Sequence, residues 1–373
     1  MPRPRKNTDF SFWEHHGWLK ERDIVIVGAG FVGLSAAVES RKRLPDARIT
    51  ILESSPLNGG GSTKNAGFAC FGSPSELLED LRTLGEEKTL ELVKKRYEGL
   101  ESLKSSFSAE QIGYDHTGSV EMFTSEVSLL EKDVLEELPR INSLLKEVFS
   151  EEPFQVVAVD SGLCGATSVI SSTFEGIIDT AKLYRAALKK AVDAGVDILN
   201  GVKVESIYKS DGGWSLDFTH GEITTKTVLV ANNSMGSTLV PGLDVAPRAN
   251  RVLVTAPIEG LKFRGSCHYD RGYVYLRRID SPEGPRMLIG GGRQWGDGES
   301  EEVKIRLMEF LREHVEGAQE ARYEYDWLGY LGVGRDRNPI VMTVEPGIHV
   351  GVRMGGMGVA IGGVIGRELA QLV

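Results

Sequence analysis

Asp23-Ile-Val-Ile-Val-Gly28-Ala-Gly30-Phe-Val-Gly33 reads as a buried apolar strand, a glycine turn and the start of a helix of small residues. A second apolar strand, Arg48-Ile-Thr-Ile-Leu-Glu53, completes a βαβ unit. The three glycines permit a tight turn, the close approach of a pyrophosphate and close helix packing, and the phosphate then meets the helix N-terminus. The stretch therefore predicts a Rossmann-like, nucleotide-binding fold.

Glu53 strengthens this prediction by its position. It lies twenty residues beyond Gly33, at the end of the second strand, where a carboxylate accepts hydrogen bonds from ribose hydroxyls and disfavours a 2′-phosphate. NAD and FAD share their adenosine and pyrophosphate, so the βαβ unit leaves both cofactors open. The predicted contacts in this unit are Gly28, Gly30, Phe31, Val32, Gly33 and Glu53.

Composition narrows the range of partners. The chain has 373 residues, 41% of them apolar, which is enough for two domains, and a formal charge of −10. An acidic chain is poorly suited to binding nucleic acid, because that affinity depends on clustered Lys and Arg. We therefore expect a small-molecule partner and no nucleic acid, and the oligomeric state stays open.

Cysteine and histidine usage points to a reducing compartment and no metal. The three cysteines lie far apart and form no disulfide framework, which favours the cytoplasm. The seven histidines show no metal-ligand spacing. We expect neither a signal peptide nor a transmembrane segment, because the apolar runs are too short or too rich in glycine.

The remaining patterns predict a helical cap and a second sheet. A capping Ser73 with Pro74 and Glu76 starts a charged helix that continues to about Phe107. The apolar spacing over 125–149 is helical, and Pro139 should start a new helix there or kink the first one. A further helix is expected over 180–194, and antiparallel strands are expected at 251–255, 272–277 and 287–289.

These elements define an α/β fold of mixed α+β character. We expect a discontinuous cofactor domain, a Rossmann-like FAD-binding domain of the glutathione-reductase type, at 21–80, 157–240 and 325–373. A substrate domain with an antiparallel sheet and a helical cap should occupy 81–156 and 241–324, and residues 1–20 form an N-terminal extension.

The loop after Glu53 reads Gly59-Gly-Gly-Ser62-Thr63-Lys64-Asn65-Ala66-Gly67. It resembles the G-x-S-x-R/K-N-x-G segment of the D-amino acid oxidase and glycine oxidase superfamily, whose members depend on FAD. In that superfamily the loop runs along the pyrophosphate and the flavin. The resemblance therefore implies that FAD contacts Ser62, Thr63, Lys64, Asn65, Ala66 and Gly67.

The resemblance spans nearly the whole chain. It implies that Val204 contacts the adenine and that Ala231 ends a strand near the pyrophosphate, while Asn233 stands where the family usually has glycine. Asp336-Arg-Asn-Pro339 and a later glycine segment resemble the family's D-x-x-P and G-x-G-V/I elements. A helix N-terminus after the second element can stabilise the anionic reduced flavin. The implied contacts there are Gly355, Gly356, Met357, Gly358 and Val359.

Short motifs, including Tyr275-Leu-Arg277, are most similar to the gamma-glutamylputrescine oxidase branch. Tyr275 and Arg277 are our candidates for positioning the substrate. The family's carboxylate-gripping Arg aligns with Leu331, which favours an amine or a larger amino compound, although Arg277, Arg335 or Arg353 could replace it. Gly329 and Leu288 stand where the sarcosine oxidase branch has its flavin-linking Cys and oxygen-promoting Lys. We therefore expect noncovalent FAD and leave the electron acceptor open.

The implied reaction transfers a hydride from the carbon beside a neutral amine to FAD N5, and the resulting imine is hydrolysed. Cys70 follows the glycine loop, but a buried structural role is favoured over contact with the flavin. Two alternatives stay open: a noncatalytic scaffold or maturation protein that carries FAD, and an NAD-dependent dehydrogenase.

Overall fold

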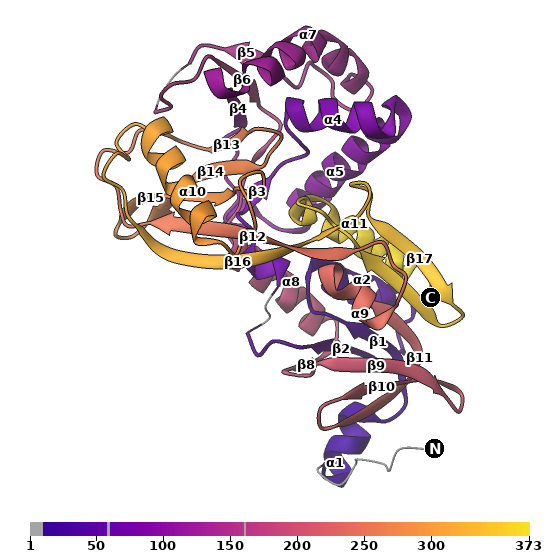
Figure 1. Cartoon of the computed structure of the whole chain (residues 1–373). Helices are drawn as coiled ribbons and strands as arrows, with labels where there is room; N and C mark the ends of the chain where they lie inside the picture. Colours follow the sequence, from indigo (N-terminus) through magenta and orange to yellow (C-terminus); the bar gives the residue numbers. More distant parts are fainter. Residues whose placement is uncertain (1–9, 58–59, 160–161) are drawn as a thin grey trace. The chain divides into compact units, whose positions relative to one another are not determined.

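The computed structural model describes residues 10–57, 60–159 and 162–373. The chain divides into two compact units, each assembled from separate segments (Figure 1). The first unit comprises residues 1–63, 181–247 and 331–373, and the second comprises residues 64–180 and 248–330.

An eight-stranded sheet forms the centre of the first unit. Its strands β18, β11, β1, β2 and β8 lie side by side in this order and run parallel. β17 is antiparallel to β18, and β10 and β9 continue antiparallel from β11. The strand bounds are β1 Arg22–Val27, β2 Ile49–Glu53, β8 Asp197–Asn200, β9 Val204–Ser210, β10 Gly213–Phe218, β11 Gly221–Val230, β17 Ile340–Glu345 and β18 Ile348–Val352.

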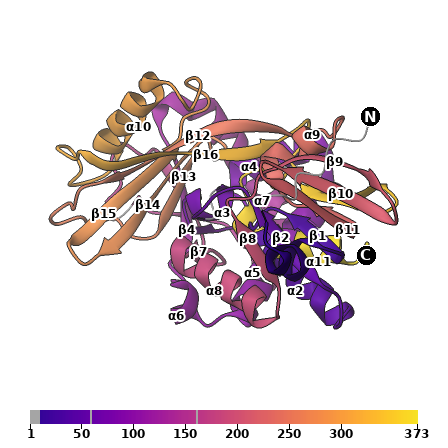
Figure 2. The ribbon, with the colours of Figure 1, turned by 90° about the horizontal axis from the view of Figure 1, so that it is seen from below.

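Two helices, α2 (Phe31–Arg43) and α11 (Gly358–Ala370), pack closely in this unit, and both ribbon views show them side by side (Figures 1 and 2). A Cβ at Gly366 would lie 2.5 Å from the Ser35 Cβ, so only glycine permits this approach. The unit's other helical segments are α1 Phe12–Glu14, a π-helix His15–Leu19, α3 Gly61–Lys64, α8 Thr180–Asp193, a 3₁₀ turn Asn233–Met235 and α9 Gly236–Leu239.

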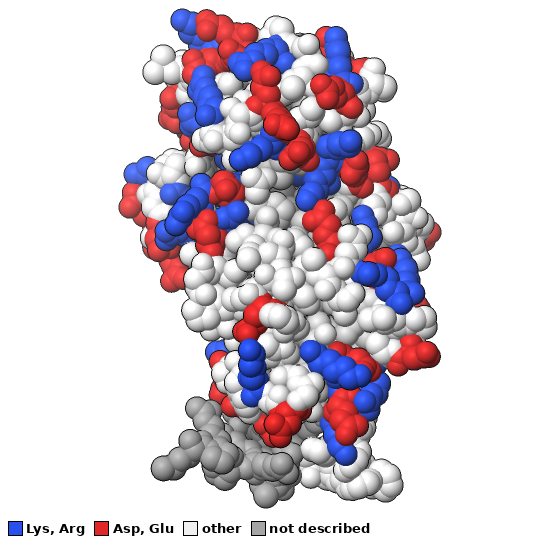
Figure 3. Space-filling model, turned by 90° about the vertical axis from the view of Figure 1, so that its right-hand side faces the viewer, with Lys and Arg blue, Asp and Glu red and all other residues white. Residues whose placement is uncertain are grey.

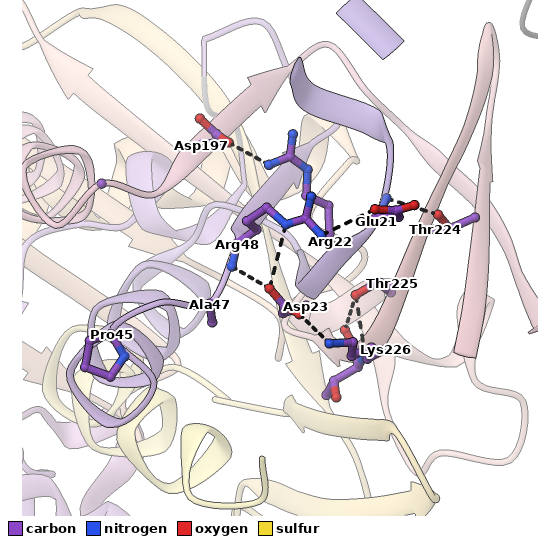
Figure 4. A network of polar contacts seen from close by, with 12 residues as sticks. Glu21, Arg22, Asp23, Pro45, Ala47, Arg48, Asp197, Thr224, Thr225 and Lys226 are labelled. Atoms are coloured by element: carbon purple, nitrogen blue, oxygen red, sulfur yellow. Dashed lines mark hydrogen bonds and ion pairs between the residues drawn. The ribbon is translucent and has the colours of Figure 1, made fainter. Parts of the chain in front are cut away.

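Charged side chains form ion pairs and hydrogen bonds with one another at the amino ends of the parallel strands (Figure 4). The Asp23 carboxylate accepts hydrogen bonds from Lys226 Nζ and from the Arg48 backbone, each at 2.8 Å. Arg22, which is buried, lies 3.2 Å from the Asp197 carboxylate. These groups satisfy one another, so they stabilise this edge of the sheet. Three predicted cofactor contacts, Gly28, Glu53 and Ala231, lie at the opposite, carboxyl edge.

The second unit contains a sheet in the order β16-β12-β15-β14-β13-β4-β6-β5. Its registered neighbours are antiparallel except β13 and β4, which run parallel. The strand bounds are β4 Ser119–Phe123, β5 Gln155–Val157, β6 Ser168–Ser172, β12 Ala246–Thr255, β13 Ser266–Tyr269, β14 Val274–Ser281, β15 Gly284–Gly291 and β16 Tyr323–Val333. A separate pair consists of β3 (Phe68–Ala69) and β7 (Gly176–Ile177).

The two faces of this sheet differ in chemistry. Alternate residues of a strand point to opposite faces, and Cys267, Leu276 and Ile289 share one face with the apolar side of α10 (Glu301–His314). Figure 2 shows α10 beside these strands. The opposite face carries polar residues on three neighbouring strands: Ser119, Glu121, Ser266, His268, Tyr275 and Arg277.

The predicted cap is present as α4 (Pro74–Leu84), α5 (Glu86–Ser106), α6 (Ala109–Ile112), a 3₁₀ turn (Ser125–Val127) and α7 (Ser128–Leu145). The capping box of Ser73 and Glu76 forms at the start of α4 as predicted. The charged helix is interrupted at Gly85, whose φ of 82° no helix interior allows. α7 continues through Pro139 on its exposed side, so no new helix starts there.

The units differ from the predicted domain bounds. Residues 64–80, 157–180 and 325–330, which we expected in the cofactor domain, lie in the second unit, and residues 241–247, which we expected in the substrate domain, lie in the first unit. The reason is packing: β6 pairs with β4, and Leu77 of α4 shares an apolar core with Val134 of α7. The assignment of the cofactor to one domain and the substrate to the other stays a prediction.

Lys and Arg side chains are interspersed with Asp and Glu on the face of the molecule in Figure 3. Among the described residues, no helix has the length and apolar character needed to cross a membrane. The same described residues contain no group of three His, Cys, Asp or Glu side chains that could hold a metal ion.

Candidate functional site

The glycine turn of the first unit has the conformation that its sequence predicts. Gly28 has a φ of 105°, and a Cβ there would lie 2.9 Å from the Ala231 carbonyl oxygen. A Cβ at Gly33 would lie 2.0 Å from the Gly28 carbonyl oxygen, which no side chain tolerates. Gly30 is the N-cap of α2, so Phe31, Val32 and Gly33 form its first turn.

Glu53 is buried at the end of β2, beside this turn. One carboxylate oxygen accepts a hydrogen bond from the Ala29 backbone at 2.9 Å and the other accepts from the Ser55 backbone at 2.8 Å. A carboxylate accepts about four hydrogen bonds, so Glu53 can bind further hydroxyls. Ser62 reaches the same turn, because its hydroxyl accepts from the Phe31 backbone at 2.9 Å. Thr63 is the next residue of α3.

Tyr184 on α8 is a contact of the turn that the sequence analysis missed. Its hydroxyl donates a 2.8 Å hydrogen bond to the Ala29 carbonyl. Burial raises the pKa of Tyr184, and the nearby Glu53 raises it further, so the hydroxyl stays a donor. An aromatic residue on an amphipathic helix is usual for a core position, so the sequence held no signal for this role.

Parallel pairing brings several distant predicted contacts to this carboxyl edge. Val27 lies between Leu52 and Val230 in register, so Gly28, Glu53 and Ala231 follow side by side. Val204 is a buried residue at the start of β9 in the same unit.

Asn233, which stands where the resemblance led us to expect glycine, adopts a backbone conformation that favours glycine. Its φ is 46°, the left-handed conformation that Asn tolerates better than most residues. Its Oδ1 accepts a 3.0 Å hydrogen bond from the Met354 backbone, and Gly355 donates to the Gly332 carbonyl at 3.1 Å. These bonds hold the start of the predicted flavin segment from Gly355 to Val359. A Cβ at Gly356 would meet nothing within 4 Å, Met357 is the N-cap of α11, and Gly358 is the first residue of that helix.

Arg353 does not have the open guanidinium that a substrate carboxylate requires. Its side chain is buried and pairs with Asp244 and with Asp336, the latter at 2.9 Å. Its Nε also donates to the Asn338 carbonyl at 2.7 Å. Arg353 therefore holds the D-x-x-P segment in place.

The first unit fits the adenine dinucleotide part of FAD. A glycine turn that admits no Cβ opens a helix, and a buried carboxylate with acceptor capacity ends the neighbouring strand. Backbone amides and a helix N-terminus of this kind bind pyrophosphate. The residues that would hold FAD here are Gly28, Gly30, Phe31, Val32, Gly33, Glu53, Ser62, Thr63, Val204, Ala231 and Gly355 to Val359.

The predicted flavin loop continues into the second unit as residues 64–67, while Gly59 lies outside the described residues. Asn65 Oδ1 accepts from the Gly67 backbone at 2.9 Å and from the Thr180 hydroxyl at 3.0 Å. Trp327 Nε1 donates to the Lys64 carbonyl at 3.1 Å, and Ala66 packs on the sheet near Leu288. The loop is therefore anchored along its length.

Tyr275 and Arg277 share the polar face of the second sheet. The Tyr275 hydroxyl accepts a 2.6 Å hydrogen bond from Asn250 Nδ2, and burial raises its pKa. Arg277 is buried and donates through Nη1 to the Ile178 carbonyl at 2.9 Å and to the Gly67 carbonyl at 3.3 Å. Burial lowers the pKa of Arg277 to about 10, and Asp179 opposes this shift. Arg277 thus anchors the loop.

Three buried titratable residues on or beside this face were missed: Glu121, Glu175 and His268. Glu121 accepts from the Ser75 backbone at 2.9 Å and from the Ser73 hydroxyl at 3.0 Å. Burial raises the pKa of Glu121 to about 7, although the bonds from Ser75 and Ser73 oppose the shift. These residues sit on short strands and loops without a motif, so only the strand register brings them together.

Cys70 is buried, and its pKa is raised chiefly by burial and also by Glu175. A thiol with a raised pKa is inert toward most partners. This environment agrees with a structural role. Leu288, which the resemblance aligned with a lysine of the sarcosine oxidase branch, is buried in an apolar cluster with Val252 and Val254.

Comparison with known proteins relates nearly the whole chain to one family. Residues 23–372 match the FAD dependent oxidoreductase family, DAO. The chain is 22% identical over 369 residues to the probable oxidoreductase OrdL of Rhizobium meliloti, covering 95% of this chain and 83% of that protein.

Solved structures share the fold. The L-proline dehydrogenase of P. horikoshii superposes with a TM-score of 0.73 at 16% identity, covering 95% of this chain and 93% of its own. The glycine oxidase of Geobacillus kaustophilus has a TM-score of 0.70 at 18% identity and covers 94% of each chain. Since the family match extends over almost all residues, the chain belongs to the DAO family of FAD dependent oxidoreductases, and FAD is its cofactor.

Proposed function

We propose that this protein oxidises the bond between carbon and nitrogen in a small amine or amino-acid-like compound, releasing an imine that water hydrolyses. The polar face of the second sheet supports this proposal, because Tyr275, Arg277 and His268 lie together there on adjacent strands. Bound FAD supplies the acceptor for a hydride from the carbon beside the nitrogen. The names of the structural relatives, a glycine oxidase and an L-proline dehydrogenase, support this class of substrate.

The chain's own residues would bind and orient the substrate. Tyr275 presents a neutral hydroxyl that Asn250 holds in place. Arg277 Nη1 donates hydrogen bonds to two backbone carbonyls, so we propose that Arg277 acts chiefly by fixing Gly67 of the flavin loop. The side chains of Val252, Val254 and Leu288 on the same face exclude water near the reacting carbon.

We also propose which residues of the loop contact the flavin and that FAD is bound without a covalent link. Lys64, Asn65, Ala66 and Gly67 would contact the flavin. No cysteine stands at position 329, so we propose noncovalent FAD. The three cysteines form no disulfide, which suits the cytoplasm, and the mixed charge on the face shown in Figure 3 suits a small-molecule rather than a nucleic-acid partner.

The first experiment is an anaerobic bleaching assay. The purified protein is denatured to test whether FAD is released, and the intact protein is mixed with glycine, sarcosine, L-proline, iminodiacetate, putrescine and gamma-glutamylputrescine. We expect at least one compound to remove the flavin absorbance near 450 nm at a saturable rate. L-Lactate, which has no nitrogen, is the control substrate.

The outcomes separate the proposal from its alternatives. Bleaching by a nitrogen compound alone supports the proposal, and the compound identifies the substrate class. Bleaching by lactate alone would replace it with hydroxy-acid oxidation. A yellow protein that none of these compounds reduces would favour the noncatalytic FAD scaffold.

A further inference from the structure

A histidine and a carboxylate lie close together at the polar face of the second sheet. His268 is 5% exposed and Glu175 is 1% exposed, and His268 Nε2 lies 4.0 Å from Glu175 Oε2. Within the described part of the chain, neither His268 ring nitrogen forms a hydrogen bond. A buried ring without such a bond is uncommon and requires an explanation.

Three hydrogen bonds hold the Glu175 carboxylate in a fixed orientation. Its Oε1 accepts hydrogen bonds from the Phe71 backbone at 2.7 Å and from the Gly72 backbone at 3.3 Å, and its Oε2 accepts from the Ser119 hydroxyl. Burial raises the pKa of Glu175, while His268 and these three donors oppose the shift and favour the carboxylate. The carboxylate therefore cannot turn away from the imidazole.

His268 belongs to the same part of the face as the substrate candidates. It pairs directly with Tyr275 in the strand register, so both side chains lie on one face. The Phe68 ring contacts both, with centroids 5.1 Å from the His268 ring and 5.5 Å from the Tyr275 ring. A substrate bound at Tyr275 and Phe68 would therefore meet the imidazole.

We propose that His268 accepts the ammonium proton of the substrate, with Glu175 orienting and stabilising it. The negative charge of Glu175, 4.0 Å from Nε2, favours hydrogen on that nitrogen, which leaves the Nδ1 lone pair to accept a proton. The N–H bond of the substrate ammonium breaks, an Nδ1–H bond forms, and the bound amine is neutral. The charge moves from the substrate to the imidazolium, which the Glu175 carboxylate balances. This assignment rests on the proposed oxidation of an amine.

Other titratable groups surround this pair and enter any pH profile. In register with His268 are Glu121 of β4 and Tyr275 of β14, and Arg277 follows two residues later on the same face. Cys70 at the end of β3 and Glu76 of α4 lie near the two carboxylates. These groups are unchanged in the variants below, so differences between profiles report on His268 and Glu175.

The first test compares pH profiles of anaerobic flavin reduction with the compound that reduces the wild type. At pH 7 an alkyl amine is almost entirely ammonium. We expect His268→Asn to lower the bimolecular rate of reduction about 100-fold at pH 7 and to recover near pH 10, where the free amine is abundant. Glu175→Gln should lose about tenfold at pH 7. His314→Asn is the matched control, because His314 is equally buried but lies on α10, against the other face.

The second test measures protons without turnover. tert-Butylamine and 2-aminoisobutyrate have no hydrogen on the carbon beside nitrogen, so they bind without being oxidised. Calorimetry at pH 8 in buffers of different ionisation enthalpy counts the protons released. We expect wild type to release none, because His268 retains the proton, and His268→Asn to release about one per molecule bound.

Parallel pH profiles and equal proton counts for wild type and His268→Asn would overturn the role of His268. The failure of every amine to reduce the wild-type flavin would instead overturn the proposed function. Retention of FAD and of the thermal unfolding midpoint in His268→Asn shows that a changed profile does not result from misfolding.

Discussion

The Tyr184 hydroxyl donates a 2.8 Å hydrogen bond to the carbonyl of Ala29, within the glycine turn of the first unit. Tyr184→Phe removes this donor and leaves a buried carbonyl without it, at a cost of about 1–2 kcal/mol. We expect the affinity for FAD to fall about five- to tenfold, because the turn that meets the pyrophosphate loses support. Fluorescence titration of the apoprotein with FAD measures this change.

Tyr208→Phe is the matched control for Tyr184. Its hydroxyl bonds to Asp217 and Glu222 on an exposed part of the same unit. That variant should bind FAD as the wild type does. Equal affinities for Tyr184→Phe and wild type would show that the turn does not depend on this bond.

Gly33→Ala should disrupt the nucleotide turn itself. The added Cβ would lie 2.0 Å from the Gly28 carbonyl oxygen, so α2 must move away from β1. We expect a loss of about 3 kcal/mol or more in the free energy of unfolding and purification without FAD. Gly17→Ala, where a Cβ meets nothing within 4 Å, should retain both stability and colour. A yellow Gly33→Ala protein would refute the role of this glycine.

The sequence predicted the elements whose physical rules are local. β1, α2 and β2 follow from apolar runs and glycine spacing, and the start of α4 follows from its capping box. The interruption at Gly85 could have been foreseen from the glycine alone. Continuation of α7 through Pro139 could not, because it depends on the core that Leu138 and Ile141 form with α4.

The site was predictable only where residues close in sequence form it. The glycines and Glu53 lie within one βαβ unit, so their spacing in the sequence is recognisable. His268 of β13 and Glu175 of a loop are 93 positions apart in the chain, and only the fold brings them together. The role of Arg353 could not be predicted for the same reason. From the sequence it was a candidate for binding the substrate carboxylate. Its partners Asp244 and Asp336 come from other segments, so no periodicity reveals the ion pairs.

Arg353→Met should therefore reduce stability without changing substrate preference. Two carboxylates lose their partner, and because both are partly exposed we expect a loss of about 2 kcal/mol in the free energy of unfolding. Urea unfolding measures it. The substrate dependence of flavin reduction gives a dissociation constant for a carboxylate-bearing substrate and one for its decarboxylated amine. The ratio of these two constants should be the same in the variant as in the wild type. A loss confined to the carboxylate-bearing compound would make Arg353 a substrate contact.

Glu121 should make the stability of the protein depend on pH in a direction opposite to most carboxylates. Burial raises its pKa to about 7 in the folded protein, above the ordinary value of 4.5. The folded state then holds a proton that the unfolded state has released between these pH values, so stability falls as pH rises from about 4.5 to 7. The full effect is about 3 kcal/mol.

Glu121→Gln removes this dependence because the amide does not ionise. Urea unfolding at pH 5, 6, 7 and 8 should show the stability of the variant rising relative to wild type up to about pH 7 and remaining level above it. Glu91→Gln, on an exposed position of α5, should follow wild type at every pH. A constant difference between Glu121→Gln and wild type across this range would mean that Glu121 is ionised in the folded protein throughout, with Ser73 and Ser75 outweighing burial.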